Sequence, residues 1–194
     1  MTPMPLFPRY RFDPRKAIDG ITFLLKDETR FDAAKPLYGP IIELRLLLIA
    51  CYLADKHHLN THGRPVFGAT YRALPSRPHP IEIYEVITGE PLWLAEAGYE
   101  TTPWRLDHTK LDLIFHSKNP ALDNLSETDK ESLLHGLKQA LTRDFSPNAA
   151  ELHGPDWQRA RLGEINYLDM VDEDNPNKIS IREAIVDSAH LLHL

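Results

Sequence analysis

The most apolar stretch of the sequence runs from Ile41 to Ala54 and is interrupted only by Glu43 and Arg45. In a helix, its apolar residues would cover nearly every side, which is typical of a helix at the centre of a globular protein. The stretch is too short to cross a bilayer, which takes about 20 apolar residues. We therefore predict a helix that begins at Pro40, ends at about His58 and is the most buried element.

Helix start signals occur at several other places. Asp13-Pro14 combines an N-cap residue with proline at the first helical position. The segments 126–129 and 180–183 have the form of a capping box, in which the first and fourth residues satisfy each other's backbone N–H groups. We predict a helix after each of these starts, and shorter helices over Ile81–Ile87 and from Ser146 to about His153.

Signals for strands are fewer. Val66–Leu74 alternates in the manner of a strand or small hairpin, and Leu111–His116 reads as a short strand. Ser76–Pro80 contains two prolines and is predicted to be irregular. The fold class predicted is mainly α, a compact multi-helix single domain with a small β-hairpin. Residues 1–11 form an N-terminal tail and residues 12–194 the domain, of which residues 176–194 are a C-terminal helix extension.

Composition excludes several classes of protein. Cys51 is the single cysteine, so the chain can form no internal disulfide and no thiolate zinc cage. The first ten residues carry three prolines and do not resemble a secretory signal. The net charge is −6 and no basic stripe is present, which argues against nucleic-acid binding. We expect a cytoplasmic protein with no membrane contact and a protein partner; a homo-oligomer stays open.

Candidate catalytic and metal-binding residues do not form a recognised motif. His58 and His62 are four residues apart, but no glutamate in a His-Glu-x-x-His pattern accompanies them. Cys51 lies among aliphatic residues, which raise a thiol pKa, and is predicted to be a core residue. We predict no metal, no cofactor and no enzymatic activity. The alternative is a small histidine-dependent metalloenzyme or hydrolase, in which His153 would converge with His58 or His62.

Two further features have two readings each. The acidic segment Asp169–Asn175 lacks the glycine and the final glutamate of an EF-hand loop, so it is predicted to be a solvated loop or a docking site for a basic partner. Trp157 follows the helix-breaking pair Gly154-Pro155. It would either pack back onto the preceding helix or remain exposed as an interface anchor.

Ordered motifs give the chain a family resemblance. The run Leu46–Lys56 ends in Tyr52-Leu53-Ala54-Asp55 and is followed by the Gly63-Arg64-Pro65 turn and by Tyr71. Pro80 and Tyr84 come next, then the segments Leu125–Asp129, Ser146–His153, Trp157 and Ile165–Tyr167. In this order they resemble the Panacea domain, also called the SocA-like antitoxin domain. His79 stands where that family usually has glycine.

The resemblance implies a mostly helical antitoxin of a toxin–antitoxin system, which neutralises a cognate toxin by direct binding and acts in settings such as phage defence. We take as candidate partner-binding residues Asp55, Arg64, Tyr84, His153 and Trp157. Asp55 ends a buried helix, and the Gly63–Pro65 turn would bring Arg64 back to it as a charge-assisted pair. Tyr84 would pack over the same turn.

Overall fold

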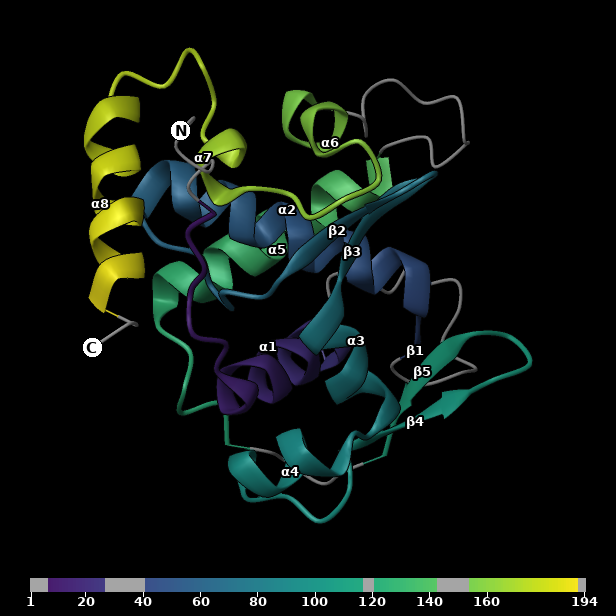
Figure 1. The fold of residues 1–194 in the computed structure, drawn as a ribbon. Helices are drawn as coiled ribbons and strands as arrows, with labels where there is room; N and C mark the ends of the chain where they lie inside the picture. The colour runs from purple at the N-terminus through teal and green to yellow at the C-terminus, as the bar shows by residue number, and fades with distance from the viewer. Residues whose placement is uncertain (1–6, 27–40, 117–120, 143–153, 192–194) are drawn as a thin grey trace.

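The fold is mainly helical, as predicted, but it contains more β-structure than a single hairpin. The computed structural model describes residues 7–26, 41–116, 121–142 and 154–191 (Figure 1). These residues form helices α1–α8, a three-stranded sheet with the order β1-β5-β4, and the two-stranded hairpin β2-β3. Within the described residues, no helix combines the length and apolar character needed to cross a membrane.

Helix α1 (Pro14–Lys26) begins where the sequence predicts. The Asp13 side chain accepts hydrogen bonds from the backbone N–H groups of Arg15 (3.0 Å) and Lys16 (3.3 Å), so it caps the first turn. Its buried apolar face then contributes Ile18, Ile21, Leu24 and Leu25 to the core.

Helices α2 (Leu44–His62) and α5 (Glu127–Thr142) form the centre of the molecule and pack extensively on each other. Leu47, Leu48 and Ile49 are fully enclosed, in line with the predicted burial of this segment. The helices approach closely at Gly136, where a Cβ atom would lie 2.4 Å from the backbone oxygen of Ala50. Only glycine permits this contact, because backbone on the facing helix cannot move aside.

Both ends of α2 differ from the prediction. Ile41–Glu43 is not helical but forms strand β1, which pairs with β5 (Asp112–Phe115). The helix therefore begins at Leu44, and it continues past His58 to His62, where Gly63 in the left-handed conformation ends it. The short strand predicted near Leu111–His116 is confirmed as β5. Strand β4 (Trp104–Asp107), which completes this sheet, was not predicted.

The β2-β3 hairpin corrects the prediction that residues 76–80 are irregular. Strand β2 (Tyr71–Leu74) pairs with β3 (Arg77–Pro80), although β3 contains Pro78 and Pro80. These prolines lie opposite Ala73 and Tyr71, whose backbone groups bond away from β3: the Ala73 N–H donates to Gly163, and the Tyr71 C=O accepts from Ile165. The prolines therefore occupy positions where the ladder needs no N–H from β3.

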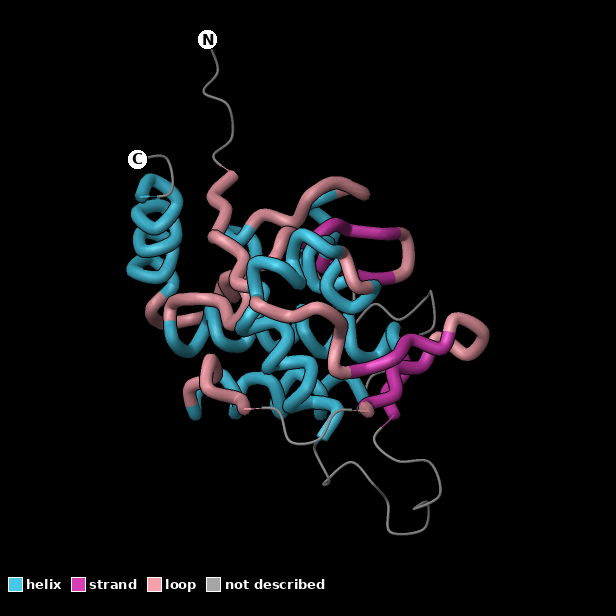
Figure 2. Tube along the Cα trace, turned by 90° about the horizontal axis from the view of Figure 1, so that it is seen from below, coloured by secondary structure: helices cyan, strands magenta, loops and turns pink. Residues whose placement is uncertain are grey.

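The remaining helices surround this centre. Helix α3 (Ile81–Thr88) ends at Gly89, as predicted, and Pro91 then starts α4 (Pro91–Ala97). Helix α6 (Pro155–Ala160), helix α7 (Tyr167–Met170) and helix α8 (Lys178–Leu191) follow α5. Helix α8 and the strands lie at opposite sides of the molecule (Figures 1 and 2). The helix predicted over 146–153 lies outside the described residues.

Both ends of the described chain contact the body of the protein. Arg9 forms a two-pronged ion pair with Glu164 at 2.9 and 2.5 Å, and the Tyr10 ring packs edge-on against Tyr167. At the other end, Ile181 and Ile185 of α8 belong to the same hydrophobic core as the rest. Helix α8 begins before the predicted capping box at 180–183, so Ser180 is an internal residue of the helix and not its N-cap.

Candidate functional site

Asp55 of α2 is fully buried and anchors the loop that follows the Gly63–Pro65 turn. Its carboxylate accepts hydrogen bonds from the backbone N–H groups of Phe67 (2.8 Å) and Gly68 (3.2 Å) and from the Tyr71 hydroxyl (2.9 Å). Burial raises the pKa of Asp55 to about 6, against the opposing effect of these donors. Asp55 is therefore a buried acceptor that holds the loop in place.

Two features keep this loop close to the helix. Gly68 has a φ of 70°, and a Cβ atom there would lie 2.8 Å from the Tyr10 Cβ, so both conformation and space require glycine. The Tyr167 hydroxyl donates to the Ala69 backbone oxygen at 2.7 Å and lies 3.5 Å from Asp55. Helix α7 is thus joined to the same centre.

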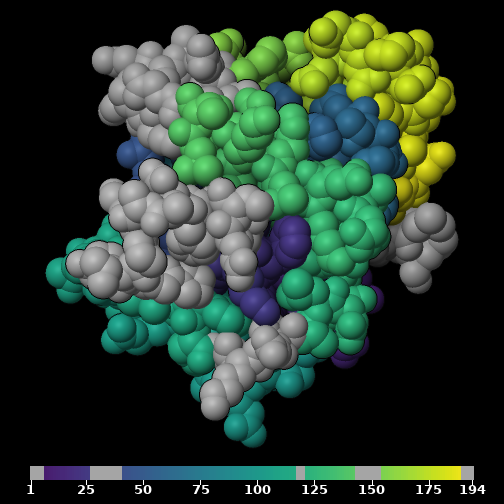
Figure 3. Space-filling model, turned by 180° about the vertical axis from the view of Figure 1, so that it is seen from behind, coloured from purple at the N-terminus to yellow at the C-terminus, as the bar shows by residue number. Residues whose placement is uncertain are grey.

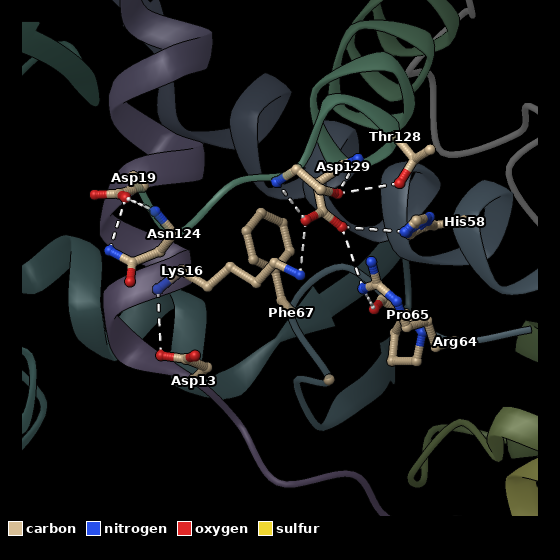
Figure 4. Close-up of polar contacts among 12 residues, drawn as sticks. Asp13, Lys16, Asp19, His58, Arg64, Pro65, Phe67, Asn124, Thr128 and Asp129 are labelled. Atoms are coloured by element: carbon tan, nitrogen blue, oxygen red, sulfur yellow. Dashed lines mark hydrogen bonds and ion pairs between the residues drawn. The ribbon is translucent and has the colours of Figure 1, made fainter. Parts of the chain in front are cut away.

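Asp129, at the start of α5, is the second buried carboxylate (Figure 4). It forms the predicted capping box: its N–H donates to Ser126 Oγ at 3.2 Å, and the Ser126 N–H donates to its carboxylate at 3.0 Å. Lys16 Nζ and Arg64 Nη1 lie 2.9 and 3.2 Å from the carboxylate. Burial raises the pKa of Asp129, but the hydrogen bonds from Lys16 and Ser126 outweigh it and lower the pKa to about 2.

The pairing of Arg64 with Asp55 is therefore wrong. The turn after α2 does bring Arg64 back toward the protein, but its guanidinium meets Asp129, while Asp55 receives backbone N–H and tyrosine donors. The capping box in the sequence predicts the contacts between Asp129 and Ser126. Nothing local to the sequence indicated that Lys16 and Arg64 would converge on it.

The other candidate partner-binding residues lie apart from these two centres. Tyr84 of α3 is 37% exposed, and its ring contacts His79 of β3. Trp157 of α6 is partly buried, and its indole N–H donates to the Leu74 backbone oxygen at 3.0 Å. Trp157 thus packs on the hairpin. His153 lies outside the described residues.

His58 is buried beside Asp129 but is not charged at neutral pH. Its Nε2 lies 3.1 Å from Asp129 without the alignment of a hydrogen bond. Burial, followed by repulsion from Arg64 and His62, lowers the pKa of His58 to about 4. The His58 and His62 rings touch, with centroids 4.5 Å apart, yet no group of three metal-ligating side chains occurs among the described residues.

Metal analysis of untagged protein tests the metalloenzyme alternative; stoichiometric zinc or manganese would favour it.

Two other candidate features have structural surroundings. Cys51 is buried in α2, and burial, together with Asp55, raises the pKa of its thiol. In the acidic segment, Glu173 contacts Arg182 and Lys178, and Asp169 pairs with Arg159 at 2.9 Å. Part of the segment's charge is thus neutralised within the chain, at Asp169 and Glu173.

Comparisons with known proteins add no relative. No family model, curated protein or solved structure matches the chain significantly.

Proposed function

We propose that this chain is an antitoxin, which neutralises a cognate toxin by direct protein–protein binding in a toxin–antitoxin system of the phage-defence kind. It acts in this proposal as a binding module with no catalytic step of its own. The resemblance to the Panacea domain supplies the function, and the arrangement of the residues that carry the resemblance supports it.

The convergence of distant motif residues carries the proposal. Asp55, Arg64, Tyr71, Asp129 and Tyr167 come from five separate motif segments of the resemblance. The fold brings them into two adjoining centres, in which Tyr71 and Tyr167 reach Asp55, and Arg64 reaches Asp129. Such contacts are what we expect if these motif residues belong to one framework, and in this sense they support the proposal.

The framework also separates residues that hold the surface from residues that can touch a partner. Asp55 is fully enclosed, so its part in binding is to hold the loop at Phe67 and Gly68. Arg64 has a half-exposed side chain that is committed to Asp129. Among the candidate partner-binding residues, Tyr84 is the one that lies exposed on a described helix. It is the side chain that we expect to contact the toxin.

Co-expression with the product of the neighbouring gene tests the proposal. We expect that product to arrest growth by itself, and to be neutralised by and co-purify with this chain. Tyr84→Ser should weaken neutralisation while the melting temperature stays unchanged. Leu92→Ser, another exposed apolar residue replaced in the same way, is the matched control. A neighbouring product that is harmless alone and does not co-purify would show that the proposal is wrong.

A further inference from the structure

A polar hollow of about 730 Å³ opens beside the C-terminal half of α2. Its walls come from α2, α5, the start of α6 and residues 172–177, which join α7 to α8. On the face seen from behind, α2 reaches the surface between α5 and the C-terminal helix (Figure 3). The two centres around Asp55 and Asp129 use none of the side chains discussed below.

Asp156 forms the inner wall of the hollow, and its side chain is 0% exposed. One carboxylate oxygen accepts a hydrogen bond from the Tyr52 hydroxyl and lies 3.3 Å from Lys56 Nζ. The other oxygen, Oδ1, is buried with no hydrogen-bond partner among the described residues. A Cβ atom on Gly154 would lie 2.7 Å from this oxygen, so a side chain there would collide with it. A buried carboxylate oxygen without a donor is costly, so a cationic or donor group beside it would be stabilising.

Among the described residues that line the hollow, carboxylates outnumber lysines. Asp156, Asp172 and Asp174 line it, and Lys56 is the lysine among the lining residues. Lys56 lies between two of these carboxylates, 3.3 Å from Asp156 and 3.7 Å from Asp172. One ammonium cannot neutralise three carboxylates, so the described lining favours a further cation.

The acidic wall is held in place by α2. Asn60 donates from Nδ2 to the Met170 backbone oxygen at 2.9 Å and accepts at Oδ1 from the Asp172 N–H at 2.8 Å. Asn175 donates to the Asn60 backbone oxygen at 2.8 Å. The loop that carries Asp172 and Asp174 is therefore ordered before any ligand arrives, which lowers the entropic cost of binding.

A flat aromatic pair forms another part of the lining. The rings of His57 and His135 are stacked, with centroids 3.8 Å apart and planes at 22°. Burial, and then repulsion from His135 and His62, lowers the pKa of His57, so this ring is neutral at neutral pH. A neutral planar ring beside carboxylates suits a guanidinium, which stacks on flat surfaces and donates several hydrogen bonds in its plane.

We propose that this hollow binds the guanidinium group of an arginine presented by the partner protein, with Asp172, Asp174 and buried Asp156 supplying the negative charge and the His57–His135 pair the stacking surface. That the partner is a toxin rests on the proposed function. Its chemistry, recognition of arginine within a polypeptide, can be tested without the toxin.

Full-length ¹⁵N-labelled protein is titrated with the peptide acetyl-Gly-Arg-Gly-amide and followed by NMR. Amide shifts are expected at Lys56, Asn60, residues 172–175 and Asn177. The citrulline analogue has the same shape without the charge and should bind at least about tenfold more weakly. The lysine analogue should bind roughly threefold more weakly, because it cannot stack or donate in a plane. Equal binding of the arginine and citrulline peptides, or shifts confined to other regions, would overturn the site; equal binding of arginine and lysine would overturn the assignment to guanidinium.

Variants separate the site from general acidity. Asp172→Asn changes a half-exposed side chain, so the fold should persist, and it should weaken the arginine peptide about threefold to tenfold. Asp123→Asn, an exposed carboxylate outside the hollow, is the control and should change nothing. Unchanged affinity in Asp172→Asn would overturn the proposal.

The toxin assay distinguishes the two ideas. Neutralisation of the toxin without arginine binding overturns the site and leaves the proposed function intact. Arginine-specific binding by a chain that neutralises no neighbouring product supports the site and overturns the proposed function.

Discussion

The two buried aspartates at the heart of this protein are both closed to solvent, but Asp55 lies deeper than Asp129, and their electrostatic surroundings differ. Asp55 is surrounded by neutral donors, and burial raises its pKa to about 6. Asp129 lies between Lys16 and Arg64, and despite burial its pKa falls to about 2. Burial alone thus does not set the charge state of a carboxylate. At Asp129 the hydrogen bonds from Lys16 and Ser126 outweigh the effect of burial on the pKa, whereas at Asp55 the backbone N–H and tyrosine donors offset it only in part.

Removal of either carboxylate should lower the free energy of unfolding more than substitution of the residues that contact it. The loss should be greater at Asp55 than at Asp129. Asp55→Ala leaves two backbone N–H groups and the Tyr71 hydroxyl buried without an acceptor, and should reduce the free energy of unfolding by ~3–5 kcal/mol. Asp129→Ala releases Lys16 and Arg64, both able to reach water, and loses the helix cap, which should cost about 2 kcal/mol. Urea unfolding of both variants checks this order. A larger loss in Asp129→Ala would break the comparison.

The pH dependence of stability should have opposite signs at the two sites. The pKa of Asp55 is raised from 3.8 to about 6, so its contribution is full below pH 4 and is lost as the pH rises through 6, by about 3 kcal/mol. The pKa of Asp129 is lowered from 3.8 to about 2, so its contribution is present above pH 4 and is lost as the pH falls through 2, by about 2 kcal/mol.

The free energy of unfolding of the wild type, minus that of Asp55→Asn or Asp129→Asn, isolates each carboxylate because asparagine does not titrate. Measurements between pH 2 and pH 7 should give a difference that falls toward high pH for Asp55 and toward low pH for Asp129. Slopes of the same sign would mean that the cations at Asp129 do not govern its pKa.

The two cations at Asp129 should not be equivalent. The Lys16 side chain is 15% exposed and the Arg64 side chain 47% exposed, so water screens the Arg64 pair more strongly. We expect Lys16→Met to cost ~1–2 kcal/mol and Arg64→Met less than about 1 kcal/mol. Thermal melts at low and high salt provide the measurement, with the Arg64 effect expected to diminish in salt. Equal losses would show that exposure does not rank the pairs.

The smallest effect concerns the neutral donors at Asp55. Tyr71→Phe removes a hydroxyl 2.9 Å from the carboxylate, so the pKa of Asp55 should rise further and stability should fall by about 1 kcal/mol. Tyr167→Phe is the control, since that hydroxyl donates mainly to Ala69 and lies 3.5 Å from Asp55. ¹³C NMR titration of the Asp55 carboxyl carbon measures the pKa in both variants. A larger change in the pKa of Asp55 in Tyr167→Phe than in Tyr71→Phe would show that Tyr167 is the principal hydroxyl donor to Asp55.

Local signals predicted much of the helical framework and part of the candidate site. Asp13-Pro14 marks the start of α1, Gly89 ends α3, and the Ser126–Asp129 capping box starts α5. Each of these depends on residues within about one helical turn, and the apolar pattern that places α2 at the centre lies within a single helix. The second capping box, at 180–183, has the same form but is not used, because α8 begins at Lys178.

Long-range contacts decided the rest. Ile41–Glu43 becomes a strand because β5, some 70 residues later, pairs with it, and Arg77–Pro80 becomes one because its prolines face positions of β2 that bond elsewhere. Arg64 pairs with Asp129, although Asp55 is closer to it in the sequence, because the Phe67 and Gly68 N–H groups already satisfy Asp55. Sequence by itself determined where α1 and α5 begin and which faces are apolar, since these follow from capping and periodicity within one helix. Only the tertiary structure determined which charges meet, because such partners are selected by packing between segments that the chain holds far apart.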